Sequence, residues 1–251
     1  MWQLAVQQWL VVMIVIAATT VLGAFVVPRL RPWIPLLVPV MLGLSCGVIA
    51  VRGLAELGRT ASAVLFDRPL AQALGLPDGG GVLLGLAIGL AGAWAAFRSE
   101  AALLRWKPAL RRPTATPGLP LGGASLPLPG RSESMKGVAA IARRPGLFLA
   151  VSVLSATGEE LLFRGAMLAE APWQLPGLAA GLLGLQAVLF AGTHVAFGWR
   201  TMLGKVLLGL ALGLGAAFGG LLVGALLPHL AYQVRVLAQF RPVTRRVPGH
   251  A

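Results

Sequence analysis

The sequence predicts an all-α membrane protein, a polytopic transmembrane helical bundle of about seven spans with its N terminus outside. Three observations predict this fold class. The 251 residues are 57% apolar and only 12% charged, about half the charge of an ordinary soluble domain. Apolar runs of roughly twenty residues recur along the chain, as helices that cross a bilayer require. The 33 glycines, many of them in Gly/Ala/Leu tracts, allow helices to approach closely in lipid.

Seven apolar runs are expected to cross the bilayer. The first has no Lys or Arg before it and is too long for the core of a signal peptide, so we expect a retained span. Residues 53–78 are too interrupted to span, and a helix on the outer surface or an ordinary loop fits them about equally. The expected spans are residues 5–27, 33–51, 80–97, 146–168, 177–198, 201–219 and 221–240.

The basic residues predict the orientation. With the N terminus outside, sixteen of the 21 Lys and Arg residues fall on one face: two at 29–31, nine at 98–144, two at 200–205 and three at 241–246. Only three fall in the opposite loops, all of them between 52 and 68. This asymmetry satisfies the positive-inside rule. The net charge of +13 therefore marks the cytoplasmic face and argues against a nucleic-acid partner.

The chain divides into four segments by composition. Residues 1–97 hold the N-terminal transmembrane helices, and residues 98–145 form a basic, Pro/Gly-rich cytoplasmic loop. Residues 146–240 hold the remaining spans, and residues 241–251 form a basic cytoplasmic tail. The single cysteine, Cys46, excludes internal disulfides and a cysteine-based metal cluster, and we expect it to be apolar filler.

The histidines and the carboxylate pair inside the predicted spans gather in the last 95 residues. An ionisable side chain in hydrocarbon costs on the order of 3 kcal/mol even on lenient scales, so such residues usually have a function. They are Glu159, Glu160 and Arg164 in "EELLFRG", Phe190 and His194 in "FAGTH", and His229 and Gln233 in "HLAYQ".

Helical spacing predicts how these residues face one another. Glu160 and Arg164 are four apart, so they share a face and are expected to form a charge-assisted pair. Glu159 points about 100° away and needs another partner. His194 and His229 are the candidates. A carboxylate beside a neutral imidazole in a dry pocket is able to activate a water molecule as a nucleophile.

The two later motifs supply further groups. His229 and Gln233 share a face and can both donate hydrogen bonds, which would stabilise a developing oxyanion. Phe190 and His194 also share a face, which places an aromatic wall beside the imidazole. Counting 1.5 Å of rise per residue from the span edges places Glu159 and His194 roughly 10 Å apart in depth. The simpler alternatives are that the histidines connect helices and that Glu160–Arg164 is structural.

Together, the three motifs resemble the CPBP family of intramembrane proteases, which includes the type II CaaX prenyl endopeptidases. The family pattern is Glu-Glu-x-x-x-Arg, then Phe-x-x-x-His, then His-x-x-x-Asn or another residue. "EELLFRG" and "FAGTH" match this pattern, whereas Gln233 replaces the frequent Asn. The resemblance covers residues 146–240, which would then be the protease core.

The resemblance implies a peptide hydrolase of the glutamic type or a metalloprotease. Glu159 and His194 would activate water, His229 and Gln233 would stabilise the tetrahedral intermediate, and Glu160 and Arg164 would fix the geometry. We expect no cofactor, because no ligand pair has a recognised zinc spacing. The alternative is Zn²⁺ held by Glu159, His194 and His229.

The expected substrate is a membrane protein or a lipidated peptide within the bilayer. A prenylated tail, a C-terminal sorting segment and a peptide precursor all remain open, and the location is the plasma (inner) membrane if the protein is bacterial. One alternative is a non-catalytic immunity or scaffold protein of the same family, which the Gln233 substitution favours. Another is a proton-coupled transporter, although the polar residues do not form a path across the bilayer.

Overall fold

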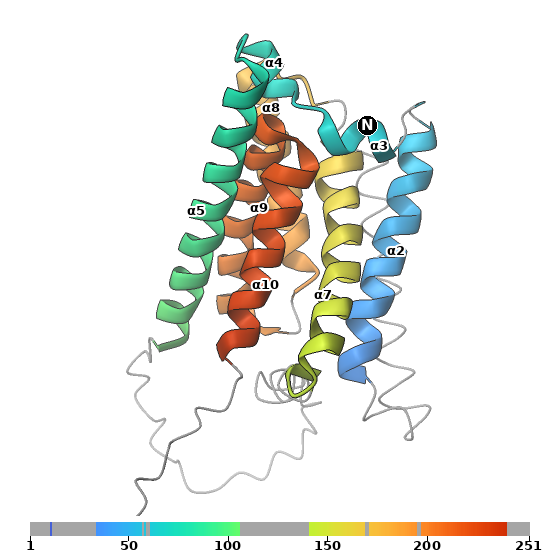
Figure 1. Cartoon of the computed structure of the whole chain (residues 1–251), viewed down its shortest axis with the longest axis vertical. Helices are drawn as coiled ribbons and strands as arrows, with labels where there is room; N and C mark the ends of the chain where they lie inside the picture. Colours follow the sequence, from blue (N-terminus) through green and yellow to red (C-terminus); the bar gives the residue numbers. More distant parts are fainter. Residues whose placement is uncertain are drawn as a thin grey trace, which may run out of the picture.

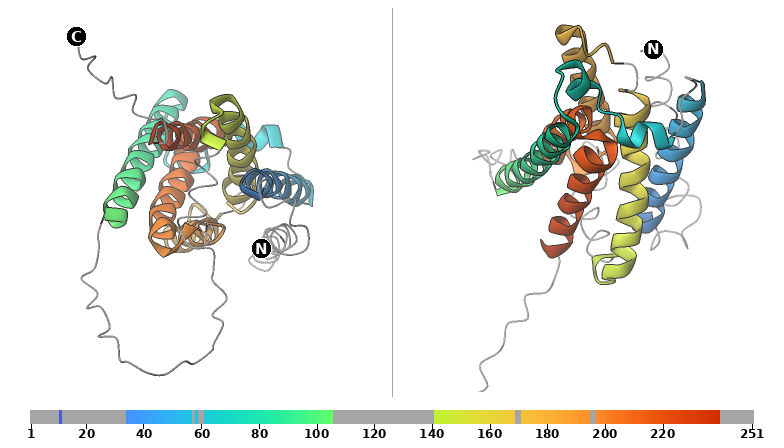
Figure 2. Two further views of the ribbon diagram at one scale, coloured as in Figure 1. Left: turned by 90° about the horizontal axis from the view of Figure 1, so that it is seen from below. Right: turned by 45° about the horizontal axis from the view of Figure 1, so that its top comes forward.

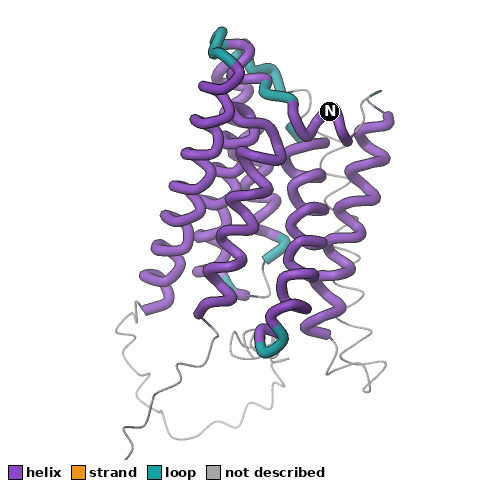
Figure 3. Tube along the Cα trace, viewed as in Figure 1, coloured by secondary structure: helices purple, strands orange, loops and turns teal. Residues whose placement is uncertain are grey.

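The computed structural model describes residues 11, 34–56, 58, 61–105, 141–168, 171–194 and 197–239, and these ranges contain helices, turns and loops but no strand (Figures 1 and 3). Four helical stretches within them are long and apolar enough to cross a membrane: Leu37–Ala55, Asp78–Leu103, Pro145–Ala166 and Trp199–Gln239. The protein is therefore an all-helical integral membrane protein. The predicted span at 5–27 lies outside the described residues apart from Val11. The count of seven spans and the outer N terminus stay predictions.

The helix that carries the two glutamates lies between its neighbours in the bundle. It is α7 (Pro145–Glu160), continued by the π-helix η3 (Leu161–Ala166), and it stands between α2 (Ile34–Glu56) and α10 (Leu227–Gln239) (Figures 1 and 2). Helices α5 (Asp78–Arg105), α8 (Pro176–Gly192) and α9 (Trp199–Gly220) complete the bundle, with α9 packed between α5 and α8 and α8 also in contact with η3. A single buried cluster, which includes Phe163, Phe190 and Leu208, joins these helices.

The last stretch reverses direction at Gly220. This glycine has φ 79° and ψ 159°, a left-handed conformation that L side chains rarely adopt. It separates α9 from the π-helix η5 (Leu221–Leu226), which leads into α10. The two arms pack so closely that a Cβ on Gly224 would overlap the carbonyl of Gly215. The predicted turn near residue 220 is therefore confirmed.

Helix ends differ most from the predicted spans in α5 and α8. Helix α5 continues to Arg105, eight residues past the predicted edge at 97, because "SEAALLR" still favours helix after the apolar run ends. Helix α8 ends at Gly192, six residues before the predicted edge at 198. There the Thr193 hydroxyl donates to the Phe190 carbonyl at 2.7 Å and satisfies a terminal acceptor of the helix.

Residues 61–73 form two short helices at one end of the bundle. These are α3 (Ala61–Phe66) and α4 (Pro69–Ala73) (Figure 1). Val64 and Ala71 are buried, whereas Phe66 is 65% exposed. Of the two possibilities for residues 53–78, the structure thus shows short helices after α2, which itself extends to Glu56.

A glycine contact fixes α7 against α2. A Cβ on Gly43 would lie 2.8 Å from the Leu154 carbonyl oxygen, and a Cβ on Gly158 would overlap the Gly43 carbonyl. Small residues allow two backbones in lipid to approach this closely. The contact involves Gly158, the residue directly before Glu159. Helix α2 therefore packs against α7 at the position of the glutamates.

Candidate active site

The two glutamates are at the C-terminal end of α7, where the α-helical hydrogen-bond pattern changes to a π-helical one. Glu159 and Glu160 are the last residues of α7, and Arg164 belongs to the following π-helix, η3. The Met167 amide donates to the Leu162 carbonyl at 3.0 Å, five residues earlier. Such π-helical turns are uncommon and occur frequently at functional sites.

Glu160 is the centre of a buried polar network. Its Oε1 atom accepts from Arg164 Nη1 at 3.1 Å and lies 2.7 Å from His229 Nδ1. Glu160 and His229 are both 0% exposed, and Arg164 is 4% exposed. The predicted Glu160–Arg164 pair is therefore confirmed. The network also joins α7 to α10, which helical spacing alone did not predict.

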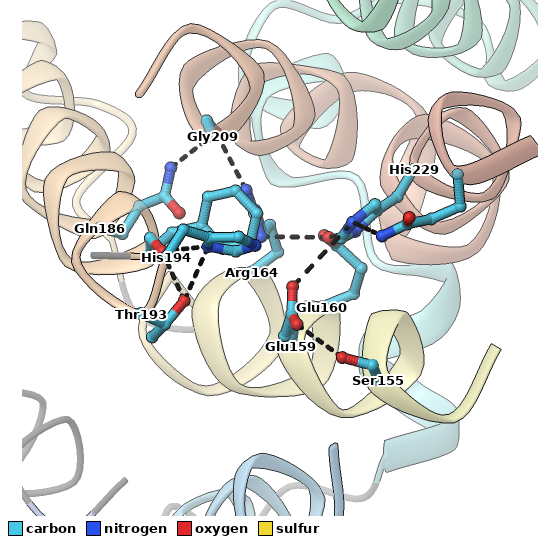
Figure 4. Close-up of polar contacts among 11 residues, drawn as sticks. Ser155, Glu159, Glu160, Arg164, Gln186, Thr193, His194, Gly209 and His229 are labelled. Carbon is cyan, nitrogen blue, oxygen red and sulfur yellow. Dashed lines mark hydrogen bonds and ion pairs between the residues drawn. The ribbon is translucent and has the colours of Figure 1, made fainter. Parts of the chain in front are cut away.

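Glu159 lies beside this network and has fewer partners. The Ser155 hydroxyl donates to its Oε1 atom at 2.7 Å (Figure 4). Its Oε2 atom has no hydrogen-bond partner among the described residues, and it faces His229 Nε2 at 4.0 Å. Of the two predicted partners of Glu159, the structure places His229 nearby. Ser155 was not predicted. Its hydroxyl lies four residues before Glu159 on the same helix, so helical spacing could have identified it as a partner.

His229 presents its two ring nitrogens to different groups. Nδ1 donates to the Glu160 carboxylate, which in the neutral ring leaves Nε2 as an acceptor. The side-chain amide of Gln233 lies 3.5 Å from Nε2. Nε2 therefore faces both the Gln233 amide and the free Glu159 oxygen.

His194 lies on the other side of this group of residues, at the end of α8. Its Nδ1 atom is 3.2 Å from the Phe190 carbonyl oxygen and 3.0 Å from Thr193 Oγ1. The Phe190 ring lies 5.1 Å from the His194 ring and 5.9 Å from the His229 ring, so it contacts both imidazoles. Figure 4 shows His194 on the Arg164 side and His229 on the Glu160 side. No direct contact joins His194 to Glu159 among the described residues.

Arg164 reaches from η3 to α9. Its guanidinium lies 4.3 Å from the centre of the Phe190 ring, and Nη2 donates to the Gly209 carbonyl at 3.3 Å. Gln186, 1% exposed, donates to the same carbonyl at 2.9 Å. Gln186 was missed in the sequence because it belongs to none of the three motifs, although a lone amide in the apolar run "PGLAAGLLGLQAVLFAG" is itself unusual.

A second polar cluster lies close to the first. The Tyr232 hydroxyl donates to Glu100 on α5, and the Lys205 ammonium lies 4.1 Å from the centre of the Tyr232 ring. The sequence predicted Lys205 in a cytoplasmic loop, and this prediction is wrong. Helix α9 begins at Trp199, and Lys205 is only 6% exposed inside it. The polar residues are thus not confined to the last 95 residues, because Glu100 comes from the first half.

The predicted zinc ligands do not form a metal site in the part of the chain that the structure describes. No group of three His, Cys, Asp or Glu side chains there lies close enough together to hold a metal ion. Glu159 and His229 approach each other, while His194 contacts neither of them directly.

Comparison with known proteins supports the resemblance seen in the sequence. Residues 142–234 match the family model described as type II CAAX prenyl endopeptidase Rce1-like. No curated protein and no solved structure matches the chain. The matched segment contains α7, α8, α9 and the part of α10 that carries His229 and Gln233, which are the elements that bring the polar residues together. Residues 142–234, the segment that carries all three motifs, are therefore similar to the type II CAAX prenyl endopeptidases of the Rce1-like kind.

Proposed function

We propose that the protein is an intramembrane endopeptidase that hydrolyses a peptide bond of a membrane-associated substrate with a water molecule activated by Glu159. One observation carries the proposal. Two adjacent buried carboxylates have different partners, because Glu160 is bonded through Oε1 to Arg164 and His229, whereas Glu159 is bonded only to Ser155 and directs its Oε2 atom toward His229 Nε2 at 4.0 Å. A structural ion pair explains Glu160 and Arg164, but it does not explain why a second carboxylate is buried beside them.

The Glu159–His229 distance suits a shared water. The 4.0 Å between Glu159 Oε2 and His229 Nε2 is too long for a direct hydrogen bond, yet a water oxygen at about 2.8 Å from each atom fits between them. In the proposed reaction this oxygen bonds to the scissile carbonyl carbon, and Glu159 takes the proton. Glu159 then passes the proton to the amide nitrogen as the C–N bond breaks.

His229 and Gln233 are proposed to stabilise the tetrahedral intermediate. The Glu160 carboxylate on Nδ1 fixes the orientation of the His229 ring, and Nε2 is proposed to face the reacting carbonyl oxygen. The Gln233 amide is a donor on the same side. Arg164 fixes Glu160, and through it the orientation of His229.

His194 enters the proposal through Phe190. The Phe190 ring contacts both imidazoles, so His194 borders the same group of residues from the side of α8. We propose that His194 orients the attacking water together with Glu159. The alternative that His194 only anchors the end of α8 is testable, because an anchor affects stability more than turnover.

The proposed reaction requires no cofactor. No group of three His, Cys, Asp or Glu side chains among the described residues is placed to hold a metal ion, and no step is routed through zinc. Metal analysis of the purified protein, with activity measured before and after a strong chelator, tests this point. Stoichiometric zinc whose removal abolishes cleavage would replace the proposed mechanism with a metalloprotease mechanism.

The proposed substrates are prenylated C-terminal tails, C-terminal sorting segments and peptide precursors at the membrane. The Rce1-like match supports the first of these. For a bacterial chain, the expected location is the plasma (inner) membrane with the basic loop and tail in the cytoplasm.

Membrane proteomics tests the function even though the substrate is unidentified. Cells with the wild-type protein are compared with cells that carry Glu159→Gln or His194→Ala at equal protein levels. The expected result is an uncleaved membrane-associated precursor that accumulates in both variants. Cleavage that persists in both variants excludes the assignment, and a biological effect retained by Glu159→Gln without any cleavage indicates a non-catalytic role.

A further inference from the structure

Lys205 is a buried cation that the proposed reaction does not use. It lies in the second turn of α9 and is 6% exposed. A buried ammonium is costly unless an anion or several hydrogen-bond acceptors compensate its charge. The groups around Lys205 therefore indicate what kind of anion would compensate its charge.

The local partners of Lys205 only partly compensate this charge. The ammonium lies over the Tyr232 ring at 4.1 Å, a cation–π contact. The nearby Glu100 carboxylate is engaged by the Tyr232 hydroxyl. Among the described residues, no hydrogen bond or ion pair reaches Lys205 Nζ, although its three donors would suit a carboxylate.

Lys205 lies next to the proposed reaction site. Its ammonium is close enough to Glu159 and His194 to interact electrostatically with both. Tyr232 follows His229 by three residues, which is about 4.5 Å further along α10. The ammonium therefore lies about one helical turn from the reacting groups, toward the end of the bundle where α5 and α10 terminate (Figure 1).

We propose that Lys205 and Tyr232 form a subsite that binds a carboxylate of the peptide substrate. A single ammonium on a flexible stem suits one carboxylate, whereas phosphate groups are more often bound by forked arginine donors. Extended residues span at most about 3.5 Å each, so this carboxylate lies within about three residues of the cleaved bond. The inference rests on the proposed protease function and names a recognition element of its substrate.

Paired peptides test the subsite directly. A fluorogenic farnesylated peptide, cleaved three residues before its end, is prepared as the free acid, as the C-terminal amide, and as an amide with Asp at the last position. Binding of each uncleaved peptide is measured in detergent with Glu159→Gln protein and with Glu159→Gln/Lys205→Met protein. Cleavage is measured with the wild type and with Lys205→Met.

The expected result is that Lys205→Met no longer binds the free-acid peptide more tightly than the amide. Removal of a charge-assisted hydrogen bond costs about 1.5–3 kcal/mol, so the acid should bind about 10- to 100-fold more tightly than the amide. Lys205→Met should weaken binding of the free-acid peptide by that factor and leave binding of the amide peptide unchanged. In the cleavage assay it should raise KM more than it lowers kcat. Equal binding of acid and amide to the Glu159→Gln protein overturns the subsite. Retained discrimination with Lys205→Met overturns it too.

Matched controls separate recognition from folding and from general charge. Arg235 is exposed on α10 and lies over the Phe97 ring, so Arg235→Gln removes a nearby charge outside the subsite and should preserve the acid preference. Lys205→Arg should retain part of it. A preference for the Asp amide over the plain amide assigns the subsite to acidic side chains as well as to chain ends. Peptides that bind with the expected preference but are never cleaved by the wild type contradict the protease function and leave the subsite standing.

Discussion

The two adjacent glutamates of α7 have different surroundings, and the difference separates structure from chemistry. Glu160 connects two helices through Arg164 and His229. Glu159 is held only by Ser155 from its own helix and keeps an oxygen without a partner among the described residues. A carboxylate bonded to a guanidinium and to an imidazole of another helix makes the bundle rigid, whereas one bonded only to a hydroxyl of its own helix remains available to a reacting group. Neutral substitutions at the two positions should therefore have different consequences.

The largest expected effect is that of Glu160→Gln. It leaves the buried Arg164 without its anion and removes the acceptor of His229, and loss of one partner of a buried pair typically costs about 3–5 kcal/mol. Both the free energy of unfolding in detergent and peptide cleavage should fall strongly. Asp78→Asn is the control, because the Arg68–Asp78 pair is exposed and is worth at most about 1 kcal/mol. Equal stability losses for the two variants would contradict the structural role of Glu160.

Glu159→Gln should affect activity without affecting stability. A general base contributes about 10²- to 10⁴-fold to the rate, so cleavage should fall by that factor. The Ser155 hydroxyl can still donate to the amide oxygen, and the unfolding midpoint should therefore stay close to that of the wild type. Cleavage assays and thermal unfolding of the same preparation check the result. A variant that unfolds as easily as Glu160→Gln would show that both carboxylates are structural.

Ser155→Ala tests the hydrogen bond that holds Glu159. It removes the only hydrogen bond of Glu159 that joins described residues, so the carboxylate is held less firmly for attack. Cleavage should fall about tenfold, the equivalent of roughly 1.4 kcal/mol, with little change in KM. Ser155→Thr keeps the hydroxyl and should recover most of the rate. A kcat unchanged in Ser155→Ala would exclude Ser155 as a positioning residue.

Gln233→Asn should have the smallest effect. The Gln233 amide lies 3.5 Å from His229 Nε2, at the limit of a hydrogen bond, so a shorter amide loses little in the resting state. Cleavage should change by less than about threefold, whereas Gln233→Leu removes an oxyanion donor and should cost about 10²-fold or more. Single-turnover assays with both variants distinguish these effects. Equal rates for Leu and Asn would exclude an oxyanion role for Gln233.

Helical periodicity predicted the contacts within each helix. The Glu160–Arg164 pair and the Phe190–His194 contact both follow from a spacing of four residues, and the turn at Gly220 follows from the apolar runs on both sides. Contacts between helices could not be predicted in this way. They depend on how each helix is rotated about its axis and on where it begins, and composition fixes neither.

Three observations show why helical spacing was insufficient to predict the contacts between helices. His229 bonds to Glu160 rather than to Glu159, because α10 presents its Nδ1 atom to the second carboxylate. The π-helical turn after Glu160 changes the direction of the residues that follow, and nothing in "LLFRGA" indicates it. Lys205 was predicted in a loop because a lysine near a span edge is usually solvated, while Tyr232 and Glu100 from two other helices surround it.

The contact between Gly43 and Gly158 makes the chemistry depend on a helix outside the Rce1-like segment. Helix α2 lies before residue 142, yet its backbone touches the residue next to Glu159, and its Cys46 is buried near that carboxylate. Helix α2 thus packs directly against the part of α7 that carries the glutamates. A larger residue at position 43 would separate α2 from α7 and should reduce the proposed cleavage without altering any residue of the three motifs.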